Sequence, residues 1–352
     1  MKIIKAQALK QKPDDYTHIK FGSVFTDHML EMDYQDGKWG EIVIRPYEDF
    51  VMSPATMCLH YGQGIFEGAK AFRNEQGKVT LFRIDDNLSR MNLSARRMCI
   101  PEFDVQAVKA GLLELIKIEK EWVPKQEGTA LYIRPSMIAT EAALGVKVSS
   151  KYKLFIIMSP VGPYLQGIEG TSKIMIEDQY VRASVGGTGE AKCIGNYAAG
   201  MYPTYLAKQK GYAEVLWLDA KEHKYIEEVG TMNVMLVIDN KVYTPALTGS
   251  ILRGITRDSA IKILRDSNIE LIEEHISVDF MLKAFEEGKF TEMFGVGTAA
   301  VISPIGTLNY KGKDYVLNGN KSGPVAKMLY QKLDDIRKLR VPDKYHWLTV
   351  LD

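Results

Sequence analysis

A stretch near the middle of the chain, Ser159–Gly170, constrains the fold more than any other feature. Its sequence, SPVGPYLQGIEG, holds two prolines and three glycines, and no apolar periodicity continues through it. Proline and glycine interrupt regular elements, so the stretch predicts a linker between two domains. The length of 352 residues agrees, because domains usually span about 100–200 residues. We expect one domain over 1–159, a linker over 160–170 and a second domain over 171–352.

Strands and helices are mixed on both sides of this linker. The strands expected before it are Glu41–Ile44, Val79–Phe82, Ala130–Ile133 and Leu154–Ile157, with helices over Asp85–Met98 and Val105–Glu119. The strands expected after it are Ile174–Ile176, Glu214–Leu218, Asn233–Ile238, Lys241–Tyr243, Glu270–Glu273 and Glu292–Phe294. The helices expected there are Ala198–Lys210, Thr256–Ser267, Val278–Glu287 and Pro324–Leu339. This mixture predicts an α+β or mixed α/β architecture with largely mixed sheets.

Composition excludes several classes of protein. Forty-five Lys and Arg against 44 Asp and Glu give a net charge of +1, so no nucleic-acid partner is expected. No apolar stretch approaches the roughly 18 residues that span a bilayer, and the N-terminus lacks a signal-peptide core, so no membrane partner is expected. Three cysteines without C-x-x-C spacing indicate a reducing compartment, and we expect a cytoplasmic protein.

A lysine stands in an unusual setting at Gly186–Tyr197, GGTGEAKCIGNY. Lys192 lies in a glycine-rich segment of low charge, five residues before Tyr197. A lysine held in a partly apolar pocket has a depressed pKa and becomes a nucleophile toward aldehydes. The alternative is an ordinary loop lysine among flexible glycines.

Three further segments carry candidate binding residues. In EEVGTMN, Glu228 and Thr231 precede a strand, where a carboxylate can pair with a cationic ring nitrogen; a solvated acidic loop is the alternative. In ILRGITRDS, Thr256 begins an expected helix, and the free N–H groups of its first turn can bind an anion. An ordinary capped helix start is the alternative.

The third segment, FGVGTAA, matches the G-x-G-x-x-A dinucleotide fingerprint. Pro304 and Gly306 follow at once, so no helix can open where a pyrophosphate needs one. We therefore expect a tight turn whose N–H groups and Thr298 hydroxyl face a small anion. Six scattered histidines without metal-binding spacing give no reason to expect a metal site.

A lysine, a tyrosine, a carboxylate and two anion-binding turns are together what pyridoxal 5′-phosphate needs. The sequence resembles the branched-chain amino-acid aminotransferases, of the fold-type IV pyridoxal-phosphate family. The segments that carry the resemblance are FGSVFTDHM, YGQGIFEGAKAF, NLSRM, LYIRP, PVGPY, the lysine segment, EVGTMN and FGVGTA. It implies a small α/β domain and a larger pseudo-barrel domain, in a homodimer with the site near the dimer interface.

The resemblance also implies site residues. Lys192 would bind the cofactor's aldehyde and act as the catalytic general acid–base, Tyr197 would bond its phenolic oxygen, and Glu228 would hold its ring nitrogen protonated. Thr231 would also contact the cofactor. The residues implied for its phosphate are Arg90, Ile255, Thr256 and Thr298.

For the substrate, the resemblance implies transamination of L-leucine, L-isoleucine and L-valine with 2-oxoglutarate. Tyr132 would receive the α-carboxylate together with the Thr298–Ala299 turn, and Arg134 would lie near the second substrate's distal carboxylate. The residues implied for the apolar side-chain pocket are Phe21, Tyr61, Phe66 and Tyr164. Plain core packing is the alternative for the aromatic residues.

Other functions remain open at this point. Within the same fold they are a D-amino-acid aminotransferase and a 4-amino-4-deoxychorismate lyase, which share the lysine and the glutamate. A nicotinamide-dependent oxidoreductase would rest on GVGTAA. A binding protein that retains the fold without catalysis is the last alternative.

Overall fold

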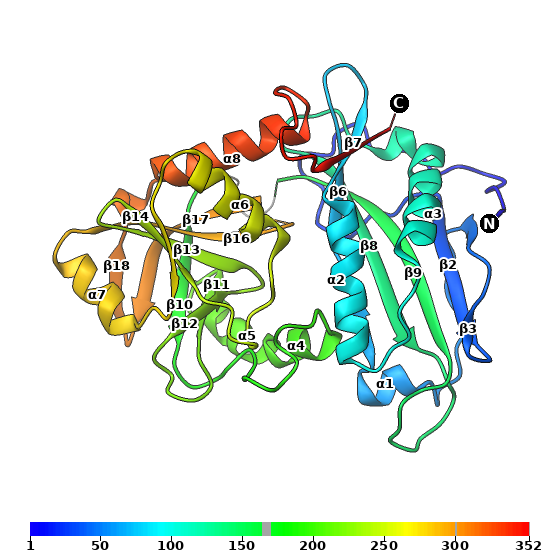
Figure 1. The fold of residues 1–352 in the computed structure, drawn as a ribbon, viewed down its shortest axis with the longest axis horizontal. Helices are drawn as coiled ribbons and strands as arrows, with labels where there is room; N and C mark the ends of the chain where they lie inside the picture. Colours follow the sequence, from blue (N-terminus) through cyan, green and yellow to red (C-terminus); the bar gives the residue numbers. More distant parts are fainter. Residues whose placement is uncertain (164–169, 300, 352) are drawn as a thin grey trace. The chain divides into compact units, whose positions relative to one another are not determined.

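The fold is taken from a computed structural model, which describes residues 1–163, 170–299 and 301–351. These residues form two compact units, labelled by element in Figure 1. Unit 1 contains Met1–Pro163, Ala191–Gly195 and the described part of Ile336–Asp352. Unit 2 contains the described residues of Tyr164–Glu190 and of Asn196–Asp335. The structure therefore differs from the expected domains in three segments. Residues 191–195 and 336 onward fold with unit 1, and 160–163 also belong to unit 1 rather than to a linker, because a strand continues to Val161.

Unit 1 is built on one mixed sheet. Ten strands of the described chain form it in the order β1-β4-β2-β9-β8-β6-β7-β19, with β3 paired to β2 and β5 to β8. Their bounds are β1 (Lys2–Ile3), β2 (His28–Gln35), β3 (Lys38–Trp39), β4 (Val43–Pro46), β5 (Gly64–Phe66), β6 (Ala69–Arg73), β7 (Val79–Phe82), β8 (Ala130–Ala139), β9 (Tyr152–Val161) and β19 (Leu348–Leu351). The helical elements are α1 (Met57–Tyr61), α2 (Ile84–Arg97), α3 (Val105–Ile118) and the 3₁₀ turn η1 (Lys120–Trp122).

The core of unit 1 lies on one face of this sheet. Leu112 and Leu115 of α3 are fully buried there, as the apolar spacing of that helix predicts. Side chains alternate along a strand, so Leu131 and Ile133 of β8 enter this core. Tyr132, between them, points to the opposite face. That second face of β8 carries the polar residues considered below.

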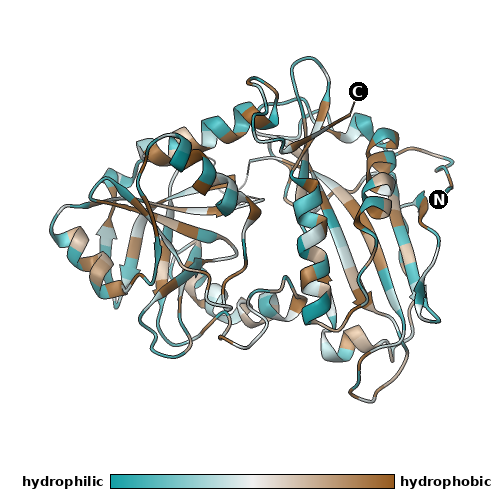
Figure 2. Ribbon diagram, in the orientation of Figure 1, coloured by the Kyte–Doolittle hydropathy of each residue, from teal (hydrophilic) through white to brown (hydrophobic). Residues whose placement is uncertain are grey.

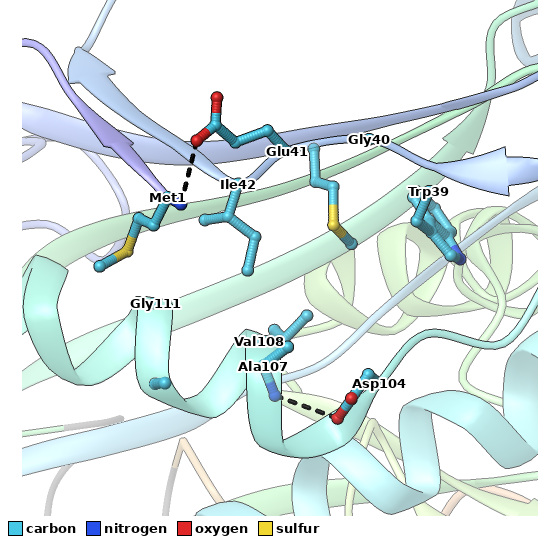
Figure 3. A pocket seen from close by; sticks show the side chains of 11 residues that line it. Met1, Trp39, Gly40, Glu41, Ile42, Asp104, Ala107, Val108 and Gly111 are labelled. Atoms are coloured by element: carbon cyan, nitrogen blue, oxygen red, sulfur yellow. Dashed lines mark hydrogen bonds and ion pairs between the residues drawn. The ribbon is translucent and has the colours of Figure 1, made fainter.

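A pocket of about 420 Å³ lies where α3 meets the strands at the N-terminal end of unit 1 (Figure 3). The Asp104 side chain caps α3 there by accepting from the N–H groups of Gln106 and Ala107. Apolar side chains supply most of the lining, which consists of Met1, Met32, Trp39, Gly40, Glu41, Ile42, Asp104, Ala107, Val108, Ala110 and Gly111.

Unit 2 is built on a second mixed sheet. Nine strands of the described chain form it in the order β12-β11-β10-β17-β16-β13-β14-β15, with β18 paired to β17. Their bounds are β10 (Ser172–Glu177), β11 (Glu214–Leu218), β12 (Ile226–Val229), β13 (Asn233–Ile238), β14 (Lys241–Pro245), β15 (Leu271–Glu274), β16 (Phe290–Gly297), β17 (Val301–Tyr310) and β18 (Lys313–Val316). The helical elements of the second half are α4 (Ile194–Ala199), α5 (Met201–Gln209), α6 (Ile255–Asp266), α7 (Val278–Glu286), η2 (Asn318–Asn320) and α8 (Pro324–Arg337).

The sheet of unit 2 curls. β12 begins the strand order, yet it also contacts β13 and β14, and Val229 bridges to Met232. The strands are largely apolar, whereas the helices alternate apolar with polar residues (Figure 2). The core of unit 2 lies against these strands, with Leu236 and Leu308 fully buried. This curled mixed sheet confirms the expected fold class.

Most expected helices form close to their predicted bounds, but one prediction was wrong. The single helix expected over Ala198–Lys210 is two helices, α4 and α5, which Gly200 separates. Pro203 lies in the first turn of α5, where its missing N–H breaks no helical hydrogen bond. Within the described residues, no helix has both the length and the apolar character needed to cross a membrane.

Candidate active site

The segment 191–195 extends the sheet of unit 1 beside β5. Cys193 forms an antiparallel bridge with Ile65, and the Phe66 N–H donates to the Lys192 carbonyl at 3.0 Å. On the other side, the Lys192 N–H donates to Ser94 Oγ of α2 at 2.9 Å. Strand pairing and helix together therefore fix the backbone of Lys192, whose Nζ lies 4.8 Å from the centroid of the Phe66 ring.

A second cation, Arg134, lies over the same ring. Its guanidinium carbon is 4.6 Å from the Phe66 centroid, and Nη2 donates to the Tyr132 hydroxyl at 3.1 Å. The Tyr132 ring meets Phe21 edge-on at 4.9 Å. Gly68 makes room for that hydroxyl, since a Cβ at position 68 would lie 2.3 Å from it. Unit 1 therefore groups the five expected residues Phe21, Phe66, Tyr132, Arg134 and Lys192.

Arg134 retains capacity to bind an anion. Its Nε is buried and has no hydrogen-bond partner among the described residues. A buried guanidinium N–H without a partner costs free energy, and a carboxylate would satisfy it.

Arg90 forms a buried ion pair with Glu67, which the sequence analysis did not identify. Arg90 Nε and Nη2 donate to Glu67 Oε1 and Oε2 at 2.7 and 2.9 Å. The Glu67 side chain is fully buried, and its Oε2 also accepts from the Gly68 N–H at 3.1 Å. This two-point geometry fixes the guanidinium of Arg90 in orientation.

Tyr61 lies at the end of α1 and is 41% exposed. Its hydroxyl donates to the Leu144 carbonyl, which ties α1 to the loop that follows β8. Leu144 and Val146 of that loop are also largely exposed. Tyr61 is therefore part of an exposed apolar surface of unit 1. Tyr164 lies outside the described residues.

Unit 2 contains a pocket of about 390 Å³ that brings three expected residues together: Tyr197, Glu228 and Thr231. The rest of its lining comes mainly from α5 and β11 and consists of Arg182, Asn196, Gly200, Met201, Thr204, Tyr205, Lys208, Glu214, Trp217 and Gly230. The volume lies within the usual range for small-molecule sites, about 300–1,000 Å³.

Glu228 is held in this pocket by one hydrogen bond and one ion pair. Its Oε1 accepts from the Leu252 N–H at 2.8 Å, and its Oε2 lies 3.3 Å from Arg182 Nε. Arg182 Nη2 is itself fixed by the carbonyls of Gly189 and Ser250, at 2.9 and 2.6 Å. The hydrogen bond and the ion pair favour the charged form of this carboxylate, which is only 3% exposed.

Glu227, the preceding residue, has a strongly raised pKa. Burial raises the pKa of its carboxyl to about 7, and the neighbouring charge of Glu228 acts in the same direction. The Ser250 hydroxyl donates to its Oε1, and its Oε2 is buried without a partner among the described residues. Of these two adjacent acids, Glu228 is therefore the one whose charged form its surroundings favour.

Three loops of unit 2 meet at one edge of its sheet. Asn233 pairs with Val296, which sets the Gly230–Met232 turn next to the turn that contains Thr298 and Ala299. The Asn233 amide also donates to the Leu252 carbonyl at 2.9 Å, just before α6 begins.

Ile255 and Thr256, both buried, form the first turn of α6. Thr231, Thr298 and this first turn therefore share one edge, and β17 follows the Thr298 turn as a strand. The tight turn expected in place of a dinucleotide-binding helix is confirmed.

We predict that Glu67→Gln lowers the free energy of unfolding by about 3–5 kcal/mol, because it leaves the buried Arg90 guanidinium without its carboxylate. Urea unfolding of the purified protein measures this. Glu102→Gln is the matched control, since Arg96 of α2 pairs with Glu102 in the same forked geometry but at an exposed position. Equal effects of the two variants would contradict the prediction.

We predict that Glu227 makes stability fall as pH rises from about 4.5 to about 7. In this window the folded state retains a proton that the unfolded state has released. The free energy of unfolding is therefore highest below about pH 4.5 and has lost the contribution of Glu227 above about pH 7. Glu227→Gln should remove this fall in the free energy of unfolding, which is on the order of 1–2 kcal/mol after solvent screening. Thermal unfolding across this pH range measures it, with the exposed Glu222→Gln as control. A slope retained in Glu227→Gln would refute the assignment.

Comparison with known proteins identifies the family. The family model for amino-transferase class IV matches residues 64–308. The probable branched-chain-amino-acid aminotransferase of Staphylococcus epidermidis is 48% identical over 349 residues, which cover 99% of this chain and 97% of that protein. The branched-chain-amino-acid transaminase 1 of Bacillus subtilis is 46% identical, over 96% of this chain and 95% of that protein.

Solved structures agree with the sequence relatives. The branched-chain amino acid aminotransferase of Escherichia coli has a TM-score of 0.77 at 26% identity, covering 92% of this chain and 98% of that one. A T.th. branched-chain amino acid aminotransferase, solved with pyridoxamine 5′-phosphate, has a TM-score of 0.74 at 25% identity, covering 90% and 97%. This chain belongs to the branched-chain-amino-acid aminotransferases of aminotransferase class IV.

Proposed function

We propose that this protein transfers the amino group of L-leucine, L-isoleucine and L-valine to 2-oxoglutarate, giving branched 2-oxo acids and L-glutamate. Pyridoxal 5′-phosphate is the proposed cofactor. The observation that carries the proposal is the unit 2 pocket in which Tyr197, Glu228 and Thr231 meet. The names of the relatives support the reaction, and the pyridoxamine 5′-phosphate of the T.th. structure supports the cofactor.

The residues present fit this cofactor. Glu228 is a buried carboxylate held by an N–H and a guanidinium, which suits a partner for a protonated ring nitrogen. The first turn of α6 and the Thr298 hydroxyl share one edge of the sheet, and a helix N-terminus favours a phosphate. The pocket volume of about 390 Å³ also suits a small aromatic ring.

When bound, pyridoxal 5′-phosphate supplies an electron sink for the electrons released at the substrate α-carbon. Lys192 would hold the cofactor at its aldehyde carbon, and its Nζ, when free of that bond, would move a proton at the substrate α-carbon as general acid–base. Tyr197 donates from its hydroxyl to the phenolic oxygen, and Glu228 keeps the ring nitrogen protonated. Thr231 contacts the cofactor from the turn before β13.

Arg90 is the proposed phosphate-binding guanidinium, and its pair with Glu67 orients it. The N–H groups of Ile255 and Thr256 and the Thr298 hydroxyl complete the phosphate site.

Substrate binding uses the second face of the unit 1 sheet. Tyr132 receives the α-carboxylate with the Thr298–Ala299 turn, and Arg134 binds the distal carboxylate of glutamate or 2-oxoglutarate. The buried Arg134 Nε that lacks a partner among the described residues supports this role. The residues proposed for the aliphatic side chain are Phe21, Tyr61, Phe66 and Tyr164.

We also propose that the protein acts as a homodimer in the cytoplasm. The exposed apolar surface around Tyr61 supports the dimer, because such a surface on one chain is typical of an interface. Its other members are Leu59, Leu144, Val146 and Val148, exposed by 57–84%. Three free cysteines, Cys58, Cys99 and Cys193, support a reducing compartment.

We predict that Lys192→Ala lowers leucine-dependent glutamate formation by at least about 10²–10⁴-fold, because no other group replaces its Nζ as general acid–base. Coupled glutamate assays and the visible absorbance of the protein with pyridoxal 5′-phosphate measure this. Lys283→Ala is the control, since that side chain is 77% exposed on α7. Transamination by Lys192→Ala at the control's rate would overturn the proposed function.

We predict that Val146→Glu dissociates the dimer, because a charge in an apolar interface is costly to bury. Sedimentation velocity measures the mass, with Val316→Glu on β18 as the control at an exposed valine of unit 2. A monomeric wild-type protein that retains full activity would refute the proposed dimer.

A further inference from the structure

Arg134 is a charged side chain in a site that is proposed to take aliphatic and acidic substrates alike. The guanidinium forms no ion pair among the described residues, and its Nε is buried without a hydrogen-bond partner there. The distal carboxylate of 2-oxoglutarate would satisfy this group, whereas leucine and its 2-oxo acid have no such carboxylate. A role confined to the distal carboxylate therefore gives Arg134 no function while an aliphatic substrate is bound.

The Arg134 guanidinium is held by aromatic rings. Its carbon lies 4.6 Å from the Phe66 centroid and 5.2 Å from the Tyr132 centroid. Tyr132 and Arg134 are two positions apart on β8, so their side chains leave the same face of the sheet. Phe66 ends β5 opposite Ser136 of β8 and shares that face. Cation–π attraction to two rings therefore fixes the position of the guanidinium.

The Tyr132 hydroxyl is held in one position as well. Arg134 Nη2 donates to it at 3.1 Å. On another side the hydroxyl lies directly against Gly68, where a Cβ would be only 2.3 Å away. The Gly68 N–H is fixed by its donation to Glu67 Oε2 at 3.1 Å. Because the hydroxyl accepts from the guanidinium, its own O–H is left to donate, and it donates to no acceptor among the described residues.

We propose that Arg134 also acts on the α-carboxylate, by holding the Tyr132 hydroxyl so that its O–H donates to that carboxylate in every substrate. The inference rests on the proposed function, in which Tyr132 receives the α-carboxylate. Arg134 is then a positioning residue for aliphatic substrates in addition to binding the distal carboxylate of a dicarboxylate. A guanidinium has five N–H donors, so one N–H of Nη2 can serve the hydroxyl while Nε serves the distal carboxylate.

Two effects of this hydrogen bond favour the α-carboxylate. Donation from a charged group polarises the phenol, and a hydroxyl that accepts such a bond donates a stronger one in turn. The bond also selects one orientation of the O–H, which can otherwise point to either side of the ring and loses that freedom when substrate binds. An aliphatic substrate therefore gains from Arg134 without contacting it.

The test is a double-mutant cycle of Arg134→Gln and Tyr132→Phe, measured with 4-methyl-2-oxopentanoate, which has no distal carboxylate. In the holoenzyme, Arg134→Gln should lower kcat/KM for this substrate about three- to tenfold, as the loss of one net hydrogen bond does. The same substitution in the Tyr132→Phe background should lower it no further, because the hydroxyl that Arg134 positions is absent. A value unchanged or raised in Arg134→Gln, or equal losses in the two backgrounds, would overturn the proposal.

Tyr132→Phe alone gives a second test that leaves the buried cation in place. Without the hydroxyl, Arg134 Nη2 is released to the distal carboxylate. The loss of kcat/KM should therefore be about threefold smaller for 2-oxoglutarate than for 4-methyl-2-oxopentanoate. Equal losses with the two substrates would contradict a guanidinium that the hydroxyl and the distal carboxylate share.

Arg96→Gln is the matched control, because that side chain is 68% exposed on α2, and it should leave both kcat/KM values unchanged. Thermal unfolding verifies that each variant is folded. Wild-type protein that forms no glutamate from leucine and 2-oxoglutarate would refute the proposed function. An active wild-type enzyme whose two substitutions have additive effects would refute only this role of Arg134, so the two failures are distinguishable.

Discussion

The pairing of 191–195 with β5 is the constraint on which the candidate site depends. These five residues fold with unit 1, whereas the residues on both sides of them fold with unit 2. The Lys192 backbone is held on one side by Phe66 and on the other by Ser94. A nucleophile must be held in one orientation to act efficiently, and here strand pairing and a helix supply that orientation.

Buried charges recur around the candidate site, and each is compensated in a different way. Arg90 and Glu67 neutralise each other through two hydrogen bonds. Leu252 and Arg182 favour the charged form of Glu228, while burial raises the pKa of Glu227 to about 7. Burying an ion without such partners costs on the order of several kcal/mol. The folded chain therefore buries these ionisable side chains where hydrogen bonds, ion pairs or a shifted pKa compensate them.

The sequence predicts the helices better than the strands. The apolar spacing of α3 indicated its bounds almost to the residue, because one helix carries its own periodic signal. β17 was not predicted, and it contains Pro304 and Gly306, residue types that are uncommon inside strands; β10 pairs with it only from Ile305, just past the proline. The motifs indicated Lys192, Glu228 and the Thr298 turn. Glu67 and Arg182 carry no local signal, because their charged partners, Arg90 and Glu228, lie far from them in the chain.

The end of the chain has a consequence for synthesis. β19 is the last strand, and it pairs with β7, near the beginning of the chain, where Leu351 lies opposite Val79. Every described strand of unit 2 lies between these two partners in the sequence. A ribosome releases the chain from the N-terminus, so unit 2 has all of its strands while unit 1 still lacks its edge. The domain that is started first is the one that is completed last.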